Sequence, residues 1–495
     1  MHVELGTASR PEVVAIVADV VRGRLPGWRP LLPVDGEDGE AAGGGTCGGS
    51  GLWNVLWSWG KPRLDYGALL AFQRVNHIPN SRQLTRKDLL ARHLDRLLGP
   101  AASVMPRSFA LPQDYSAFVA CFASSSRHSR RSRGLEDPTA AAAHAHAHAK
   151  DVWIIKPVES SRGRGIRLVD DVAHVLYTEP SVVQRYVRDP LLLRGHKFDL
   201  RLYVLVTTFQ PHLEAFIYTE GLARFCTRPF RLDRLADPLA HLTNSSVQSR
   251  ALRGGGGGDG DGGGGGGLAE DHPLRTAPPA HVGGSKLRLS YLLELLREEH
   301  GVEPAVLWDR IKALVLASLV AVEGSIPACP RGFELFGFDV LLDTALRPWL
   351  LEVNASPSMA RESPLDADVK EALITDTLRL VDPVPFDRRA LHAVLTRKLG
   401  PSAAVGPAGP HRGQLPPRSS SHANAALGAE ELHRIMGGRH RPRQPGEEVP
   451  PELMGRYERL CPGTNLYQQT LAYKRRGKQQ QQQQHQQTGR KGKCA

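Results

Sequence analysis

The strongest constraint on the fold is a pair of strand-forming segments late in the chain, FELFGFDVLLD and RPWLLEVN, joined by a short turn through Ala345 and Pro348. Leu351 and Val353 alternate with polar residues, as expected of a strand with one buried face. Residues 152–225 hold five earlier strand-forming runs: VWIIKPV, GIRLV, SVVQRYV, KFDLRLYVLV and LEAFIY. Helical spacing returns over residues 287–323 and 365–381. The sequence therefore predicts an α/β or α+β fold with antiparallel sheet in its second half.

The N-terminal part adds mixed elements to this pattern. Residues 10–24 have the apolar spacing of a helix, and WNVLW (53–57) predicts a buried strand. Thr85-Arg86-Lys87-Asp88 has the form of a capping box and predicts a helix over 86–98. The three tryptophans of the nearby stretch have apolar neighbours, so we expect them in the core: Trp53, Trp57 and Trp59.

Four segments have the composition of flexible insertions or tails. Residues 36–51 and 253–267 are rich in glycine, and residues 125–149 pass from a Ser/Arg stretch into alternating His and Ala. Residues 401–495 hold 15 Lys and Arg against 6 Asp and Glu, and they end in a Gln tract and a basic tip. We therefore expect residues 387–495 to form a basic, mostly disordered tail.

Composition excludes several classes of protein. The 495 residues carry a formal net charge of +12, and no run of 18 apolar residues predicts a membrane span. The start of the chain lacks the apolar region of a secretory signal, and the six cysteines form no CxxC pair. We expect a soluble intracellular protein without a membrane partner. The basic tail has no interleaved aromatic residues, which disfavours nucleic acid. An acidic partner and a merely solvated extension both remain open.

The late pair of strands also carries the clearest candidate site. Glu352 and Asn354 lie two residues apart, so they point to one face of a strand, and the hairpin can bring Asp339 beside them. Two carboxylates and an amide oxygen suit Mg²⁺ held together with nucleotide phosphates, whereas the lack of His and Cys argues against zinc or copper. The alternative is an exposed strand face with solvated acids.

A second candidate lies in HKFDLRLYVLV (196–206). Lys197, Asp199 and Arg201 share one face of this predicted strand, while the opposite face is apolar. Such a face suits the wall of a cleft that binds anionic groups. A cross-strand ladder of ion pairs explains the same residues equally well.

Weaker signals come from short motifs. Lys156 precedes a Gly-rich basic turn, SSRGRGI, that could approach phosphates or be an ordinary hairpin turn. Gln184 could present a strand edge to a purine, and Arg224 could clamp a carboxylate. Thr243-Asn244 could contact a ribose or phosphate, or cap a turn.

Together these motifs resemble the tubulin tyrosine ligase-like family of ATP-grasp ligases. The stretches that carry the resemblance are IIKPVESSRGRGI, VVQRYV, GHKFDLRLYVLV, YTEGLARF, HLTNSSVQ, FELFGFDVLL and PWLLEVNASPS. The resemblance covers residues 10–386 without the insertions and is strongest to the ciliary branch of probable tubulin polyglutamylases. It implies an ATP-grasp fold with an N-terminal lobe (1–124), a central domain (150–186) and a C-terminal domain (187–386).

The resemblance also assigns roles to individual residues. ATP contacts are implied for Lys156, Arg162, Gly163, Gln184, Arg185, Tyr186, Val187, Lys197, Phe198, Asp199, Thr243 and Asn244. Catalytic roles are implied for Lys197, Arg201 and Glu352. Mg²⁺ would be held by Asp339, Glu352 and Asn354, and the incoming glutamate by Arg224, Lys286 and Lys370.

The implied activity is ATP-dependent ligation of L-glutamate to glutamate side chains of tubulin tails, through an acyl phosphate. A glycine ligase of the same family and a non-catalytic microtubule-binding protein are the alternatives. The expected partners are tubulin and microtubules, and the expected location is the cytoplasmic cytoskeleton, in a cilium or flagellum axoneme or a basal body. Arg162 stands where the nearest relatives tend to carry Gln, which leaves branch initiation and elongation open.

Overall fold

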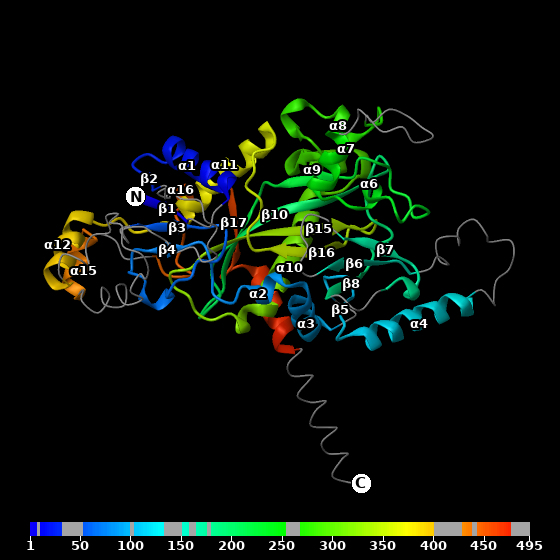
Figure 1. Ribbon diagram of the computed structural model, residues 1–495, viewed down its shortest axis with the longest axis horizontal. Helices are drawn as coiled ribbons and strands as arrows, with labels where there is room; N and C mark the ends of the chain where they lie inside the picture. Colours follow the sequence, from blue (N-terminus) through cyan, green and yellow to red (C-terminus); the bar gives the residue numbers. More distant parts are fainter. Residues whose placement is uncertain are drawn as a thin grey trace, which may run out of the picture.

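A computed structural model of the chain describes residues 1–6, 10–31, 53–99, 103–132, 151–157, 165–175, 180–253, 268–399, 428–437 and 443–476. These residues form a mixed α/β structure with three sheets (Figure 1). The Gly-rich and His-Ala segments of the sequence lie largely outside the described residues. None of the described helices has both the length and the apolarity that a bilayer crossing requires.

The N-terminal sheet is parallel and has the strand order β2-β1-β3-β4. Its strands are β1 (His2–Leu5), β2 (Arg29–Leu31), β3 (Val55–Trp57) and β4 (Arg74–Val75). Helix α1 (Pro11–Arg24) begins close to the predicted start, and β3 is fully buried, as predicted for WNVLW. The next two helices are α2 (Arg82–Thr85) and α3 (Lys87–Leu98).

The predicted capping box at the start of α3 is wrong. Thr85 is the last residue of α2, and Arg86 occupies the cap position of α3 without a side-chain hydrogen bond to the helix. The Asp88 carboxylate instead accepts two hydrogen bonds from the Arg86 guanidinium, at 3.1 and 2.8 Å. The backbone of Arg86 is extended, as a cap residue requires, but its long side chain does not cap the helix, and Thr85, whose hydroxyl could have done so, belongs to the preceding helix.

A second, antiparallel sheet has the order β5-β8-β6-β7. Its strands are β5 (Ser108–Leu111), β6 (Trp153–Pro157), β7 (Arg167–Val169) and β8 (Ser181–Arg185). Helix α4 (Tyr115–Ser132) covers it through Phe118, whose ring lies edge-on to Trp153 with a centroid separation of 5.2 Å. This sheet forms one wall of the cavity described below.

The third and largest sheet is built around β10 (His196–Thr208). One edge of β10 pairs with β12 and β11, and the other pairs with β15, which in turn pairs with β16. The remaining strands of this sheet are β9 (Leu192–Leu193), β11 (Glu214–Tyr218), β12 (Leu222–Phe225), β13 (Val282–Gly283), β14 (Lys286–Arg288), β15 (Glu334–Leu342), β16 (Pro348–Asn354) and β17 (Tyr457–Cys461). The predicted antiparallel pairing of the late strands is therefore confirmed.

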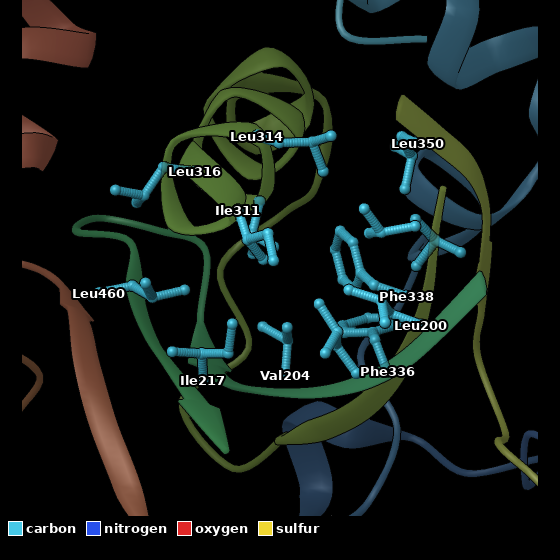
Figure 2. Packing of buried hydrophobic residues seen from close by; sticks show 14 of the residues in the cluster. Leu200, Val204, Ile217, Ile311, Leu314, Leu316, Phe336, Phe338, Leu350 and Leu460 are labelled. Atoms are coloured by element: carbon cyan, nitrogen blue, oxygen red, sulfur yellow. The ribbon is translucent and has the colours of Figure 1, made fainter. Parts of the chain in front are cut away.

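Two cores cover the two faces of this sheet. On one face, Ile311 and Leu314 of α10 (Pro304–Val322) pack over β10 and β15, as Figure 2 shows. The even-numbered residues of β10 from 198 to 206 belong to this core. On the other face, Tyr203 and Leu205 pack with α1 and with α11 (Pro364–Val381). The odd-numbered residues Lys197, Asp199 and Arg201 extend this second face beyond the core, as the strand period of two requires.

Several shorter helices complete the described structure. They are α6 (Pro238–His241), α7 (Ser245–Arg253), α8 (Pro273–Thr276), α9 (Leu289–His300), α12 (Arg388–Leu399), α15 (Ala429–Ile435) and α16 (Pro451–Met454). α9 ends at Gly301, whose left-handed φ of 64° suits a residue without a side chain.

The prediction of a mostly disordered segment over 387–495 is wrong for its described part. β17 pairs with β11 and covers an edge of the large sheet, and Leu460 joins the core around α10. The apolar residues of this segment are sparse, so the segment could not bury them alone. They are ordered by contact with strands that lie more than 200 residues earlier in the chain.

This packing predicts a measurable effect of Leu460→Ala. The side chain is 1% exposed, so its truncation should lower the free energy of unfolding by about 2–5 kcal/mol. Urea denaturation of the full chain measures the change. Glu452→Ala, at an exposed position of the same segment, is the control and should stay within about 0.5 kcal/mol of wild type. Equal stability of the two variants would contradict the packed position of β17.

Candidate nucleotide and metal site

A cavity of about 190 Å³ lies between the small antiparallel sheet and the large sheet. Lys156 and Gln184 come from the small sheet, and Lys197, Asp199 and Asp339 come from the large one. A larger cavity of about 1100 Å³ shares four lining residues with it: Pro106, Arg185, Tyr186 and Val187. The strands thus gather polar residues from separate parts of the sequence around one cleft.

The three predicted metal ligands lie together in this cleft. Asp339 on β15 is the register partner of Glu352 on β16. The Asn354 side chain donates a hydrogen bond of 3.2 Å from its Nδ2 to Glu352 Oε1. The described residues contain no group of three His, Cys, Asp or Glu placed for a metal. Two carboxylates and an amide oxygen nevertheless match the hard-oxygen ligands that Mg²⁺ prefers when phosphates complete its shell.

Two lysines lie near the Glu352 carboxylate and lower its pKa. Lys87, the first residue of α3, places its Nζ 2.7 Å from Glu352 Oε2. Burial alone would raise the pKa of Glu352, but Lys87 and Lys156 hold it well below its usual range. Glu352 is therefore a carboxylate throughout the physiological pH range, which a metal ligand must be.

Asp339 lies at the centre of a buried ion-pair network. Arg201 reaches it through Nε at 2.6 Å and Nη2 at 3.1 Å. Arg224 places Nη2 2.9 Å from Asp339 Oδ2 and also forms a two-point contact with Asp199, at 2.7 and 2.6 Å. Two guanidinium groups thus face two carboxylates, and burial raises the pKa of Asp339 although Arg201 and Arg224 oppose this effect.

Two glycines make room for Arg201. A Cβ atom at Gly221 would lie 2.6 Å from the Arg201 carbonyl oxygen, and one at Gly337 would lie 3.3 Å from its Cδ. A side chain at either position would displace the arginine or its strand. The absence of side chains there lets the guanidinium remain against Asp339.

Lys156 and Lys197 differ from these paired cations. Lys156 Nζ donates to Gln184 Oε1 at 2.7 Å, and Lys197 Nζ donates to the Tyr186 hydroxyl at 2.8 Å and to the His241 carbonyl at 2.9 Å. In the described part of the chain, neither ammonium group contacts a carboxylate. Burial lowers the pKa of each lysine to about 8. A buried ammonium group with only neutral partners is costly, and an anion in the cleft would offset that cost.

Of the other residues predicted to contact the nucleotide, some lie at the cavity and some do not. Thr243 Oγ1 donates to Asp199 Oδ2 at 2.6 Å, and Asn244 lines the cavity. The Phe198 side chain does not reach the cavity, because it lies on the opposite face of β10 and stacks on Phe225 in the core. Arg162 and Gly163 lie outside the described residues.

The predicted amino-acid contacts form a chain of charges next to the cleft. Lys286 is the register partner of Arg224, which lines the cavity. Lys286 Nζ lies 2.8 Å from Asp366 Oδ2 and 2.9 Å from Glu362 Oε2. Lys370 Nζ lies 2.7 Å from the other oxygen of Asp366, Oδ1. Lys286 and Lys370 are buried but are not among the residues that line the cavity.

Sequence reasoning missed two residues of the site. Lys87 was interpreted only as part of a capping box, although its ammonium group contacts Glu352. His241 places Nδ1 3.0 Å from the Tyr186 hydroxyl and so supports the partner of Lys197. His241 begins the stretch HLTNSSVQ but was given no role there, and Lys87 stands in no motif that suggests a site; each reaches the cleft only through tertiary packing.

Comparison with known proteins shows which family this chain is similar to. A family model described as the tubulin-tyrosine ligase family matches residues 67–254 and 283–391. Human "Probable tubulin polyglutamylase TTLL2" is 35% identical over 335 residues, 66% of this chain and 50% of that protein. Human "Tubulin polyglutamylase TTLL5" is 34% identical over 347 residues, 66% of this chain and 23% of that protein.

A third relative extends the similarity along the chain. "Tubulin polyglutamylase ttll6" of Danio rerio is 31% identical over 448 residues, 86% of this chain and 50% of that protein. The chain thus spans about half the length, or less, of these curated relatives. The family match includes every candidate site residue named above.

The ion-pair network predicts a large difference between two arginine variants. Arg224→Gln leaves Asp199 and Asp339 short of a buried cation, so it should lower the free energy of unfolding by about 3–5 kcal/mol. Arg231→Gln removes an exposed pair with Asp233 and should leave the free energy of unfolding close to that of wild type. Urea denaturation of both variants measures this difference. Similar costs would show that the network at Asp339 contributes nothing beyond a surface ion pair.

Proposed function

Because the chain belongs to the tubulin-tyrosine ligase family, we propose that it is an ATP-dependent tubulin polyglutamylase. The substrates would be ATP, L-glutamate and glutamate side chains in the acidic C-terminal tails of tubulin. The observation that carries this proposal is the cleft in which Lys156 and Lys197, two lysines without carboxylate partners among the described residues, lie near the oxygen ligands Asp339, Glu352 and Asn354. Such a cleft suits a magnesium–nucleotide pair.

The proposed reaction has two steps. The γ-phosphoryl group of ATP passes to a side-chain carboxylate oxygen of a tail glutamate, and ADP leaves. The amine nitrogen of free L-glutamate then attacks the acyl carbon and loses a proton, and an isopeptide bond forms as inorganic phosphate leaves. No enzyme nucleophile is needed, since positioning and electrostatic stabilisation supply the catalysis.

Individual residues of the chain would contribute as follows. Lys156 and Lys197 bind phosphate oxygens, and Lys197 and Arg201 neutralise charge on the phosphoryl group during transfer. Mg²⁺, held by Asp339, Glu352 and Asn354, would neutralise further phosphate charge when bound. Gln184, Arg185, Tyr186, Val187, Thr243 and Asn244 would contact the rest of the nucleotide.

The glutamate substrate would be held by Arg224, Lys286 and Lys370. These three cations lie close to one another and contact four carboxylates, those of Asp199, Asp339, Glu362 and Asp366. A cluster of three cations favours an acidic amino acid over glycine, which has no side-chain carboxylate to neutralise. Assignment to the ciliary branch, and within it to the ninth family member, with action at an axoneme or basal body, is the finer part of this proposal.

Incorporation of labelled amino acids tests the proposal directly. The full chain is incubated with microtubules, ATP and Mg²⁺, and separately labelled glutamate, glycine or tyrosine. We expect label on tubulin with glutamate alone. Label from glycine would instead support the glycine ligase, and no label from any amino acid would support the non-catalytic microtubule-binding protein.

Glu352→Gln should abolish glutamate incorporation while the fold stays intact, because the neutral amide is a weaker ligand and no longer balances Lys87. We expect a loss of at least about 100-fold in rate, as for the loss of a preorganised electrostatic contact. The measurement is the labelling assay, with circular dichroism to check folding. Glu294→Gln, the same change at an exposed position of α9, should keep wild-type activity. Wild-type labelling by the Glu352 variant would remove this residue from the proposed site.

The depressed lysine pKa values predict how ATP binding depends on pH. Below pH 8 Lys156 and Lys197 are mostly protonated and attract phosphate, whereas above pH 8 they lose their charge. The affinity for ATP should therefore begin to fall near pH 8 and approach about a tenfold loss per pH unit for each lysine that must be protonated. Calorimetric titration between pH 7 and 9.5 measures this loss.

Two further results would accompany this pH dependence. Binding at pH 8 should take up protons, detected as a buffer-dependent heat. Lys197→Met should bind ATP more weakly and with a shallower pH dependence, because one of the two titrating groups is gone. A constant affinity across the range would argue against direct phosphate contact by these lysines.

A further inference from the structure

A second cationic cavity lies away from the cleft. It encloses about 190 Å³, and three guanidinium groups line it, from Arg74, Arg331 and Arg443. We call it the arginine cavity. Its walls also include Thr207 and Thr208, at the end of β10 opposite to Lys197.

The arginine cavity is separate from the nucleotide cleft. Arg201 and Thr207 lie six residues apart on one strand, which places them about 20 Å from each other. In Figure 1, β4 lies at the left of the molecule, whereas β6 and β8 of the cleft lie at the right. None of the residues that line the arginine cavity also lines the cleft.

Within the described residues, Arg443 alone of the three arginines has a carboxylate partner. Its Nη1 and Nη2 atoms lie 2.7 Å from the two oxygens of Glu214, which also contacts Arg459 at 3.2 Å. The Glu214 oxygens also accept hydrogen bonds from the Thr207 hydroxyl and the Gly446 N–H. Glu214 therefore leaves no carboxylate oxygen to balance the other cations of the cavity.

Arg74 and Arg331 have only backbone acceptors among the described residues. Arg74 Nη1 donates to the Pro330 carbonyl at 3.3 Å, and Arg331 Nε donates to the Leu70 carbonyl at 3.1 Å. Each guanidinium has five N–H donors, so most donors of both groups have no protein acceptor in the described part of the chain. Two such groups next to a cavity form an incomplete anion site.

Electrostatics supports the same conclusion. Burial, followed by the charges of Arg331 and Arg443, lowers the pKa of Arg74 to about 10, while Asp382 opposes this effect. Burial also lowers the pKa of Arg331. The arginines thus repel one another in the free protein, and an anion between them would relieve that repulsion.

We propose that the arginine cavity is a second anion-binding site that takes one oxyanion, either a carboxylate of a glutamate-rich peptide or a phosphate group. Guanidinium groups recognise both through paired N–H donors. The cavity of about 190 Å³ has room for a single such group. If the peptide is the ligand, this site rests on the proposed function, because an acidic tubulin tail would supply the carboxylates.

The position of the cavity gives the bound anion a structural consequence. Arg74 belongs to the N-terminal sheet, Arg331 precedes β15, and Arg443 precedes β17. An anion held by all three would tie the C-terminal segment to the N-terminal and large sheets. Binding should therefore stabilise the whole chain against unfolding.

Calorimetric titration with two probes, inorganic phosphate and hexaglutamate, tests the proposal without ATP. The full wild-type chain is compared with Arg74→Gln/Arg331→Gln, with the cleft variant Lys197→Met, and with Arg22→Gln, an exposed arginine on α1. We expect at least one probe to bind wild type, the cleft variant and the Arg22 variant with similar affinity. The double variant should lose at least about tenfold in affinity, as for removal of a charged hydrogen bond.

The midpoint of thermal unfolding distinguishes a role of Arg74 and Arg331 in binding from a role in stability. Without ligand, the double variant should melt no lower than wild type, since it removes mutual repulsion, and the probes should no longer raise its midpoint. If the double variant fails to fold, Arg331→Lys keeps the charge, loses the paired donors and should bind several-fold more weakly. Tighter binding of hexaglutamate would identify a peptide carboxylate as the ligand, and tighter binding of phosphate would identify a phosphate group.

Three results would overturn the proposal. The first is that neither probe binds the wild-type chain. The second is that the double variant binds as tightly as wild type. The third is that Lys197→Met alone abolishes binding, which would place the probe in the cleft. Because no arm uses ATP or measures ligation, failure of this site and failure of the proposed ligase activity remain distinguishable.

Discussion

The pairing of β10 with β15 is the contact on which the rest of the site depends. It sets Arg201 opposite Asp339, although 138 residues separate them in the chain. From this pair the network extends to Arg224 and Asp199 on one side, and β16 adds Glu352 and Asn354 on the other. A slip of one residue in this register would turn every one of these side chains toward the opposite core. The cores on both faces of the sheet prevent such a slip, because each accepts only apolar residues.

The cleft separates its cations into two kinds. Arg201 and Arg224 contact carboxylates, so their positions are set before any ligand binds. Lys156 and Lys197 have neutral partners and are therefore available to a ligand. At the other end of β10, Arg74 and Arg331 likewise have only neutral partners among the described residues. In both places, the binding role is suggested by a buried or half-buried cation to which the described residues offer no carboxylate, because an anion would offset the cost of removing that cation from water.

Residues 443–476, the C-terminal segment, are part of the folded structure and do not form a loose extension of it. β17 covers the outer edge of β11, and Arg443 completes the contacts of the buried Glu214. An uncovered edge would expose backbone donors and acceptors to other chains. The segment therefore completes the large sheet and also supplies one wall of the arginine cavity.

The sequence alone determined the main strands around the cleft, in residues 152–218 and 333–354, and which of their side chains share a face. The alternation in residues 196–206 placed Lys197, Asp199 and Arg201 together, and the same reasoning grouped Glu352 with Asn354, because a period of two is a local property of extended backbone. Only the tertiary structure decided that Lys87 contacts Glu352, that Phe198 turns into the core, and that residues 457–461 join the sheet. These outcomes depend on contacts between segments far apart in the chain. Their free energy comes from shared burial, which no local pattern of residues records.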